Sequence, residues 1–299
     1  MIKHILCPVD RSPSSLQAFN YAIALARWQG AQLHLLEVIE TVAPPPGAAA
    51  SRAPTHAGGP NESRAALERD LRQMLVSRRA SDVKVEIVMR EGNVVREILA
   101  QARSSRADLV VIGSHGRGGV QRLVLGSVAE KVLRQATCPV LTVRRGVGRT
   151  RQNSSPFKTI LCPTDFSAAG NQAVAYAKRL AREADAQLIL MSAVDWPFGA
   201  TVTFGRVAEL QEGLEGKARK ALGRLLPPPS PDRPAAMAFV VQGKASAAIV
   251  KLARARSVDL IVMGVSGRGA LDVVLLGSTT HHVIRQGAWP VLTVPPGTR

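Results

Sequence analysis

Cysteines, aromatic residues and long apolar runs are all scarce in this chain of 299 residues. The three cysteines show no metal-ligand spacing, which excludes a disulfide scaffold and a zinc module and favours a reducing compartment. No apolar run reaches the roughly 18 residues that a membrane span needs, and the first residues lack the apolar core of a signal peptide. We therefore expect a cytoplasmic protein with no membrane segment and no metal site.

Acidic residues are also few, since 39 Lys and Arg stand against 22 Asp and Glu and give a net charge of +17. Such an excess is typical of proteins that bind nucleic acid. Here, however, the basic residues are spread evenly over both halves of the chain. Six Phe, three Trp and two Tyr leave few side chains on which bases could stack. We therefore expect an arginine-rich solvated surface and no nucleic-acid partner.

The sequence is a duplicated unit, about twice the usual length of one domain. The segment Ile5–Ser12 recurs in a closely similar form as Ile160–Ser167. The segment Pro139–Val143 recurs unchanged as Pro290–Val294. The repeat predicts a first domain at residues 1–144, a linker at 145–156 and a second domain at 157–299.

Within each copy, buried strands alternate with amphipathic helices. The expected strands of the first copy are Ile2–Val9, Leu33–Ile39, Val83–Met89, Leu109–Ile112 and Val140–Val143. The expected helices are Ser14–Gln29, a helix capped by Asn61, Asn93–Ser104 and Ser127–Ala136. Strands joined through single helices pair in parallel with right-handed crossovers. We therefore expect an α/β fold of two doubly wound, parallel, five-stranded, Rossmann-like sheets in tandem.

A glycine-rich segment follows the expected fourth strand, at the end of the sheet where open α/β folds bind ligands. It reads Gly113-Ser114-His115-Gly116-Arg117, and nine residues separate Gly116 from Gly126-Ser127 at the start of a helix. Glycines let main-chain N–H groups approach an anion, and a helix N-terminus adds free donors. Ser127 can add a hydroxyl and Arg117 a positive charge. The segment therefore predicts a phosphate site.

The alternative is that these residues only shape a turn and a helix cap. Ser127 and Glu130 form a capping-box pattern, which would make the serine a simple helix start. The second copy nevertheless keeps the same spacing in the same context, which favours phosphate binding. Its corresponding residues are Gly264, Val265, Gly267, Arg268, Gly277 and Ser278. The P-loop, the G-x-G-x-x-G fingerprint and the G-x-S-x-G elbow are all missing from the chain.

Asp10 and Asp165 follow the first strand of each copy. A carboxylate at this place can accept a hydrogen bond from a ribose hydroxyl or an adenine edge. An aspartate can equally start the turn before a helix, here with Ser12 or Ser167. The sequence leaves both interpretations open. His115 is a further candidate for a phosphate or base contact.

Three features together resemble the universal stress protein family: strands ending Pro-Val-Asp or Pro-Thr-Asp, the G-x-x-G-x9-G-S spacing, and the closing Pro-Val-Leu-Thr-Val strands. The resemblance covers nearly all residues except the linker and two variable loops, and it indicates a tandem member of the ATP-binding branch. It implies an adenine nucleotide alpha hydrolase-like fold, with ATP as the ligand and Mg²⁺ left open. It also implies pairing through the last strands, either within the chain (Val140–Val143 with Val291–Val294) or in a homodimer of tandem chains.

By position, the resemblance implies that Asp10 and Asp165 face the adenosine and that Val38 and Ala193 line the adenine pocket. The implied ATP-binding residues of the first copy are Pro8, Val9, Asp10, Val38, Gly113, Ser114, His115, Gly116, Arg117, Gly126, Ser127 and Val128. Those of the second copy are Pro163, Thr164, Asp165, Ala193, Gly264, Val265, Gly267, Arg268, Gly277, Ser278 and Thr279. The second copy has Val265, Ser266 and Val273 where the first has Ser114, His115 and Arg122. We therefore expect it to bind nucleotide more weakly.

Beyond the two strand-end aspartates, the sequence offers no clear general base, and we assign no catalytic residue. The leading hypothesis is a stress-response protein that acts through nucleotide occupancy. Two alternatives stay open. One is a slow ATPase or phosphoryl-transfer enzyme that uses the same site. The other is a scaffold whose loops at residues 41–60 and 197–206 contact partners, with nucleotide incidental.

Overall fold

The computed structural model describes residues 2–40, 60–115, 125–146, 155–195, 204–232, 234–265, 276–286 and 288–298. The first repeat contains β1 (His4–Val9), α1 (Pro13–Gln29), β2 (Gln32–Glu40), α2 (Pro60–Ser77), β3 (Val85–Gly92), α3 (Val94–Ser104), β4 (Leu109–Gly113), α4 (Ser127–Gln135) and β5 (Val140–Val143). The second contains β6 (Thr159–Pro163), α5 (Ala168–Ala184), β7 (Gln187–Val194), α6 (Phe204–Leu225), β8 (Met237–Gln242), α7 (Ala245–Ala255), β9 (Leu260–Gly264), α8 (Ser278–Gln286) and β10 (Val291–Val294). No helix in these described ranges is both long and apolar enough to cross a membrane.

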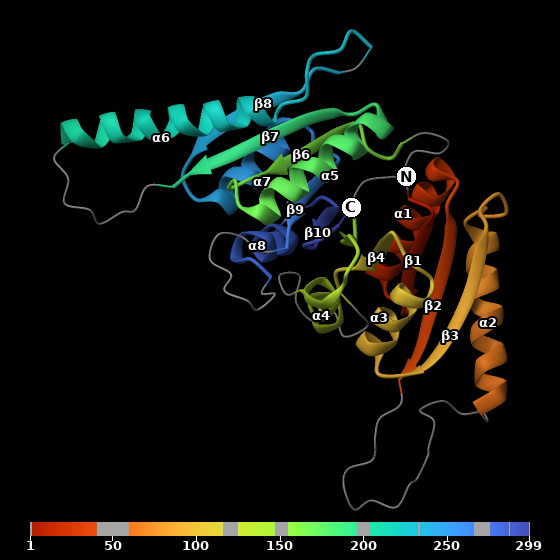
Figure 1. The fold of residues 1–299 in the computed structure, drawn as a ribbon. Helices are drawn as coiled ribbons and strands as arrows, with labels where there is room; N and C mark the ends of the chain where they lie inside the picture. The colour runs from red at the N-terminus through yellow and green to blue at the C-terminus, as the bar shows by residue number, and fades with distance from the viewer. Residues whose placement is uncertain are drawn as a thin grey trace, which may run out of the picture.

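The described strands form one sheet in the order β3-β2-β1-β4-β5-β10-β9-β6-β7-β8 (Figure 1). Within each half the neighbouring strands pair in parallel. The predicted fold class, with two parallel five-stranded units in tandem, is therefore confirmed. The structure adds that the two units share one continuous sheet.

The two halves meet where β5 pairs with β10 in the antiparallel direction. In this register Leu141 lies opposite Leu292, and Val140 opposite Thr293, whose Oγ1 donates to the Val140 carbonyl at 3.2 Å. These strands are buried throughout. The expected pairing of the last strands within one chain is thus present, and it leaves neither strand as an open edge.

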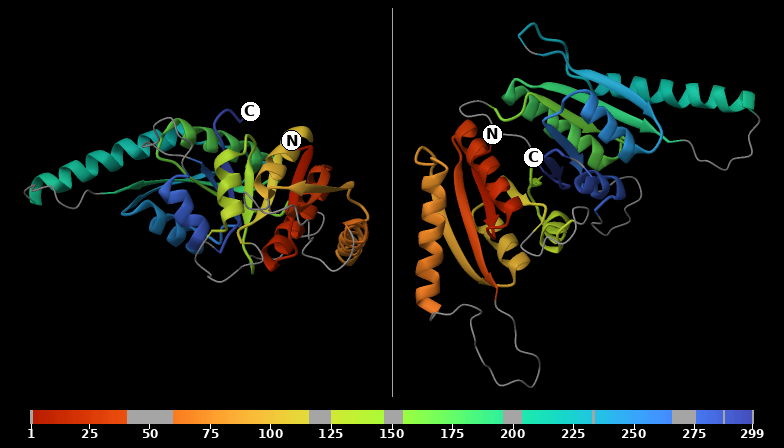
Figure 2. Two further views of the ribbon diagram at one scale, coloured as in Figure 1. Left: turned by 90° about the horizontal axis from the view of Figure 1, so that it is seen from below. Right: turned by 180° about the vertical axis from the view of Figure 1, so that it is seen from behind.

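Helices cover both faces of the sheet (Figures 1 and 2). Residues of α1, α2, α5 and α6 contribute to one apolar layer, and residues of α3, α4, α7 and α8 to the other. The strands supply both layers alternately, since Ile5 and Cys7 face the first layer and Leu6 the second. Burial on both faces explains why the strands read as continuous apolar runs.

Two expected elements differ from the structure. Asn61 does not precede its helix, because α2 already begins at Pro60. Proline suits a first helical position, since its fixed φ matches the helix and its missing N–H needs no partner. The third strand also begins later than expected and continues to Gly92, which pairs with Glu40. The polar residues near its end, Arg90 and Glu91, hid this extension from a search for apolar alternation.

Candidate functional site

Those predicted site residues of the first repeat that the structure describes lie at or near the carboxyl ends of β1, β2 and β4. Because β1 pairs with both β2 and β4, Asp10 and Ser114 follow neighbouring strands at the same edge of the sheet. Strand order reverses at β1, and such a switch point is the usual ligand crevice of open α/β sheets. The strands β6, β7 and β9 repeat this arrangement in the second half.

A tight turn holds each strand-end aspartate. Oδ1 of Asp10 accepts a hydrogen bond from the Ser12 N–H at 2.9 Å, and Oδ1 of Asp165 accepts from the Ser167 N–H at 3.0 Å. The residue between them, Arg11 or Phe166, has a φ of 63° or 64°. The turn interpretation of these aspartates is therefore confirmed. It fixes each carboxylate just beyond the carboxyl end of its strand.

The serine of each turn also begins the following helix. Oγ of Ser12 accepts from the Ser15 N–H at 3.2 Å, and Oγ of Ser167 accepts from the Gly170 N–H at 3.1 Å. These caps satisfy N–H groups that a helix start would otherwise leave without a partner. The starts of α1 and α5 are thereby fixed against the strand ends.

Gly113 and Gly264 end β4 and β9, where each strand passes close to a helix start. A Cβ at Gly113 would lie 2.7 Å from the main-chain nitrogen of Ser15 and 2.8 Å from the carbonyl carbon of Ser14. A Cβ at Gly264 would lie 2.9 Å from the carbonyl atoms of Ala169. Both glycines thus permit close packing of strand against helix. That the same residues also contact a ligand stays a prediction.

The segment that joins β4 to α4 is held at both ends, Ser114 and Gly126, by main-chain hydrogen bonds. The Ser114 N–H donates to the Val143 carbonyl at 2.9 Å, and the Ser114 carbonyl accepts from the Gly126 N–H at 2.8 Å. The last bond brings the start of α4 to the end of β4. Oγ of Ser114 lies 2.8 Å from Nδ1 of His115, and the His115 carbonyl accepts from the hydroxyl of Ser14.

The second repeat closes the corresponding segment in the same way. The Val265 N–H donates to the Val294 carbonyl at 3.3 Å, and the Val265 carbonyl accepts from the Gly277 N–H at 2.8 Å. The predicted phosphate contacts Gly116, Arg117, Gly267 and Arg268 lie outside the described residues. The structure therefore places the two ends of each predicted phosphate segment side by side.

The capping-box interpretation of Ser127 is wrong. The N-cap of α4 is Gly126, which makes no side-chain cap, and Ser127 is the first helical residue and is exposed. A capping box requires the serine one position earlier. Glu130 instead pairs with Arg134 at 2.6 Å, one turn along the helix. The hydroxyl of Ser127 and the positive end of the helix dipole thus lie beside the end of β4.

The remaining predicted residues occupy matching places in the two repeats. Val38 and Ala193 are half-buried near the ends of β2 and β7, on the side of the sheet that α3 and α7 cover. The residues at the ends of the first strands and in the first turns of the helices are Pro8, Val9, Pro163, Thr164, Val128, Ser278 and Thr279. These residues lie at or near the carboxyl edge of the sheet, and that they bind ATP stays a prediction.

The buried cysteines are not candidates for catalysis. Cys7 and Cys162 have no exposed surface, and burial raises the pKa of both thiols well above the usual range. They therefore remain protonated and weakly nucleophilic. Over the described part of the chain, no group of three or more His, Cys, Asp or Glu side chains is placed to hold a metal ion.

The sequence matches a single protein family over nearly its whole length. A model described as the universal stress protein family matches residues 1–144 and again residues 156–295. The chain belongs to the universal stress protein family. The two matches make it a tandem member, in agreement with the duplicated motifs and the doubled sheet.

Related proteins extend this result over the whole chain. A universal stress protein of Methanocaldococcus jannaschii is 34% identical over 149 residues, which cover 48% of this chain and 84% of that protein. A universal stress protein of Mycolicibacterium smegmatis is 27% identical over 296 residues, which cover 98% of this chain and 97% of that protein. The crystal structure of a universal stress protein from Archaeoglobus fulgidus shares 22% identity, covers 98% of both chains and superposes with a TM-score of 0.67. That structure shows the same fold.

The two repeats of this universal stress protein differ at a place that sequence reasoning missed. Glu37, in the middle of β2, is 3% exposed and its Oε1 lies 3.3 Å from Nη2 of Arg11. Nη1 of the same arginine lies 3.4 Å from Oδ2 of Asp70. In the second repeat Phe166 and Ser192 take the places of Arg11 and Glu37. The available signal was a glutamate between the apolar residues Leu36 and Val38 of β2.

Proposed function

We propose that this universal stress protein binds ATP or a related adenine nucleotide at the carboxyl end of each half-sheet. Nucleotide occupancy would then govern its role in the cytoplasmic stress response. Two features that lie close together in both repeats support this proposal. One is the strand-end aspartate, Asp10 or Asp165. The other is a helix that starts with Gly-Ser and is hydrogen-bonded back to the end of the fourth strand.

The two features suit different parts of a nucleotide. The uncapped start of α4 and the exposed Ser127 offer donors to phosphate oxygens. Arg117, from the same segment, would add a positive charge. Asp10 would accept from a ribose hydroxyl or the adenine edge, and the half-buried Val38 would offer an apolar contact to the base. Hydrogen bonds to a charged group contribute about 1.5–3 kcal/mol each, so a few of them suffice for micromolar binding.

The sheet also bears on how copies of this protein would associate. The resemblance implies that the family pairs through its last strands, and β5 and β10 already pair with each other within one chain. A homodimer of tandem chains would therefore use a different surface. Two nucleotide sites per chain do not depend on such a dimer, because every site residue considered above comes from one repeat.

Calorimetric titration tests this proposal with ATP, ADP and AMP, each with and without Mg²⁺. We expect binding at up to two sites per chain. Gly116→Ala and Gly267→Ala should each abolish one site, because a methyl group would stand where main chain should approach phosphate. Gly223→Ala, a change in the exposed part of α6 with nothing near the added methyl, is the matched control. No binding of any nucleotide, or unchanged affinity in the double variant, would contradict the proposal.

A further inference from the structure

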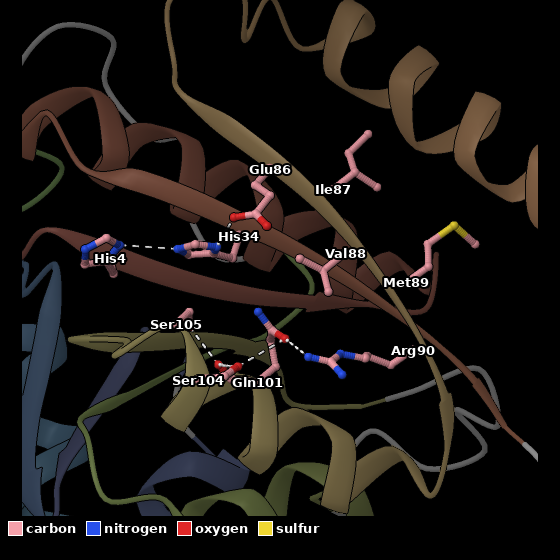
Figure 3. A pocket seen from close by; sticks show the side chains of 10 residues that line it. All are labelled: His4, His34, Glu86, Ile87, Val88, Met89, Arg90, Gln101, Ser104 and Ser105. Carbon is pink, nitrogen blue, oxygen red and sulfur yellow. Dashed lines mark hydrogen bonds and ion pairs between the residues drawn. The ribbon is translucent and has the colours of Figure 1, made fainter.

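A pocket of about 620 Å³ lies between α3 and the sheet of the first repeat (Figure 3). It is lined by residues of β1, β2 and β3 and by the C-terminal end of α3. His4 begins β1 and His34 lies near the start of β2, so the pocket extends over the amino ends of these two strands. The proposed nucleotide site lies at their carboxyl ends, and none of its residues lines this pocket.

Three polar side chains form a connected row on this face of the sheet. His34 is 5% exposed, and its Nδ1 lies 2.9 Å from Oε2 of Glu86 on β3. Nε2 of His34 lies 3.3 Å from Nδ1 of His4 on β1. Figure 3 shows the carboxylate of Glu86 turned towards His34, with His4 beyond it. Glu86 thus contacts His34 and also accepts from Nε2 of Gln32 at 3.3 Å, and its charge lies at one end of the pocket.

The opposite wall of the pocket presents hydrogen-bond donors. Gln101 is 6% exposed, and its Oε1 accepts from Nη2 of Arg90 at 2.9 Å and from Oγ of Ser104 at 3.4 Å. Because its oxygen is occupied, the amide nitrogen of Gln101 is directed into the space below His34 (Figure 3). Arg90 is exposed, and no carboxylate of the described residues pairs with it. A guanidinium and an amide N–H therefore converge on the pocket.

The second repeat shows that the fold does not need these polar groups. Ile189 pairs with Met237 across β7 and β8 as His34 pairs with Glu86 across β2 and β3. Leu252 is the eighth residue of α7, as Gln101 is of α3. The other equivalent residues are Thr159 for His4, Val241 for Arg90 and Ala255 for Ser104.

Val241 and Leu252 of the second repeat simply pack against the apolar layer. The first repeat carries polar side chains at the same places, and burial of polar groups costs free energy unless they find partners. Gln101 meets that cost through Arg90 and Ser104, and His34 lies close to Glu86 and His4. A network of this kind, built in one repeat and replaced by apolar packing in the other, indicates a ligand.

We propose that this pocket is a second ligand site, which binds a small organic monocarboxylate beside the hydrogen-bonded pair of Arg90 and Gln101. Nη2 of Arg90 donates to Gln101, and the guanidinium has further N–H donors that match a carboxylate. The amide N–H of Gln101 adds another donor. Glu86 and the negative end of the α3 dipole lie nearby and disfavour a doubly charged anion such as phosphate. The volume lies within the range of small-molecule sites.

Titration of the full chain with the monocarboxylates acetate, butyrate and benzoate tests the proposal, with inorganic phosphate as the comparison anion. We expect at least one carboxylate to bind with a dissociation constant below about 1 mM and phosphate to bind at least tenfold more weakly. Arg90→Val and Gln101→Leu introduce the residues of the second repeat, so both variants should fold. Each should weaken carboxylate binding by at least tenfold. Arg103→Ala, in the last turn of α3 but outside the pocket, should leave binding unchanged.

Several results would overturn the proposal. These are no carboxylate binding at about 10 mM, equal affinity in Arg90→Val, or tighter binding of phosphate than of any carboxylate. ATP affinity should be unchanged in Gln101→Leu, and this arm separates failure of one site from failure of the other. Arg90 does not serve for this arm, because it pairs in register with Val38 of the proposed nucleotide site. If Gln101→Leu loses its folded circular dichroism spectrum, Arg90→Lys replaces it. That variant keeps the charge but removes the paired donors, and it should also weaken binding.

Discussion

Replacement of Gly113 by alanine should destabilise the first repeat, because the strand end and the helix start leave no room for a methyl group. The added Cβ would lie 2.7 Å from the Ser15 nitrogen, 2.8 Å from the Ser14 carbonyl carbon and 3.0 Å from its oxygen. All three are main-chain atoms, so no side-chain rotation relieves the contact. Ordinary van der Waals contact requires a separation of about 3.5 Å, so α1 must move away from β4 by several tenths of an ångström.

Overpacking of this kind costs about 1–3 kcal/mol, and we expect Gly113→Ala to lower the free energy of unfolding by that amount. Equilibrium unfolding in urea, followed by circular dichroism, measures it. Gly223→Ala makes the same chemical change in α6, where nothing lies within 4 Å of the new Cβ. At this position alanine lowers the conformational entropy of the unfolded chain. The substitution should therefore raise the free energy of unfolding by about 0.5–1 kcal/mol.

The two substitutions thus have opposite expected signs. Equal stability of Gly113→Ala and the unchanged protein, or a gain like that of Gly223→Ala, would refute the close approach of β4 to α1. Gly264→Ala should behave like Gly113→Ala, since its Cβ would meet the Ala169 carbonyl atoms at 2.9 Å.

The thiols of Cys7 and Cys162 should not react with a disulfide reagent at pH 8 in the folded protein. Burial raises the pKa of both thiols and also makes them inaccessible to the reagent. Immediate modification of all three cysteines would contradict this burial. The two proposed nucleotide sites should differ, with the first repeat at least tenfold tighter. The second lacks one or more of the polar groups that we propose to contact phosphate, and each such contact contributes about 1.5–3 kcal/mol. ATP titration of Gly267→Ala and Gly116→Ala, which leave the first and the second site respectively, should show this difference, and equal constants would refute it.

The fold could be predicted because the duplicated segments and the alternation of apolar strands with amphipathic helices indicate the same architecture. Val140–Val143 forms β5 with the expected bounds, and its copy Val291–Val294 forms β10. Short apolar strands between amphipathic helices leave few other parallel topologies. The turn of Asp10 with Ser12 was also within reach, since aspartate before a helix has a strong local preference for this hydrogen bond.

Features that depend on contacts between distant segments could not be predicted. The need for glycine at position 113 arises from α1, roughly a hundred residues earlier in the chain. The capping pattern of Ser127 and Glu130 was misleading, because local spacing does not show where the helix begins. The row of Glu86, His34 and His4 likewise appears only when three strands are brought into register.

The central claim is that each repeat holds one adenine nucleotide at the carboxyl end of its half-sheet. Native mass spectrometry of the full chain, titrated with ATP, counts the bound nucleotides directly. We predict two per chain at saturation, one in each of Gly116→Ala and Gly267→Ala, and none in the double variant. A full chain that takes up no nucleotide, or a double variant that still takes up two, would contradict the account.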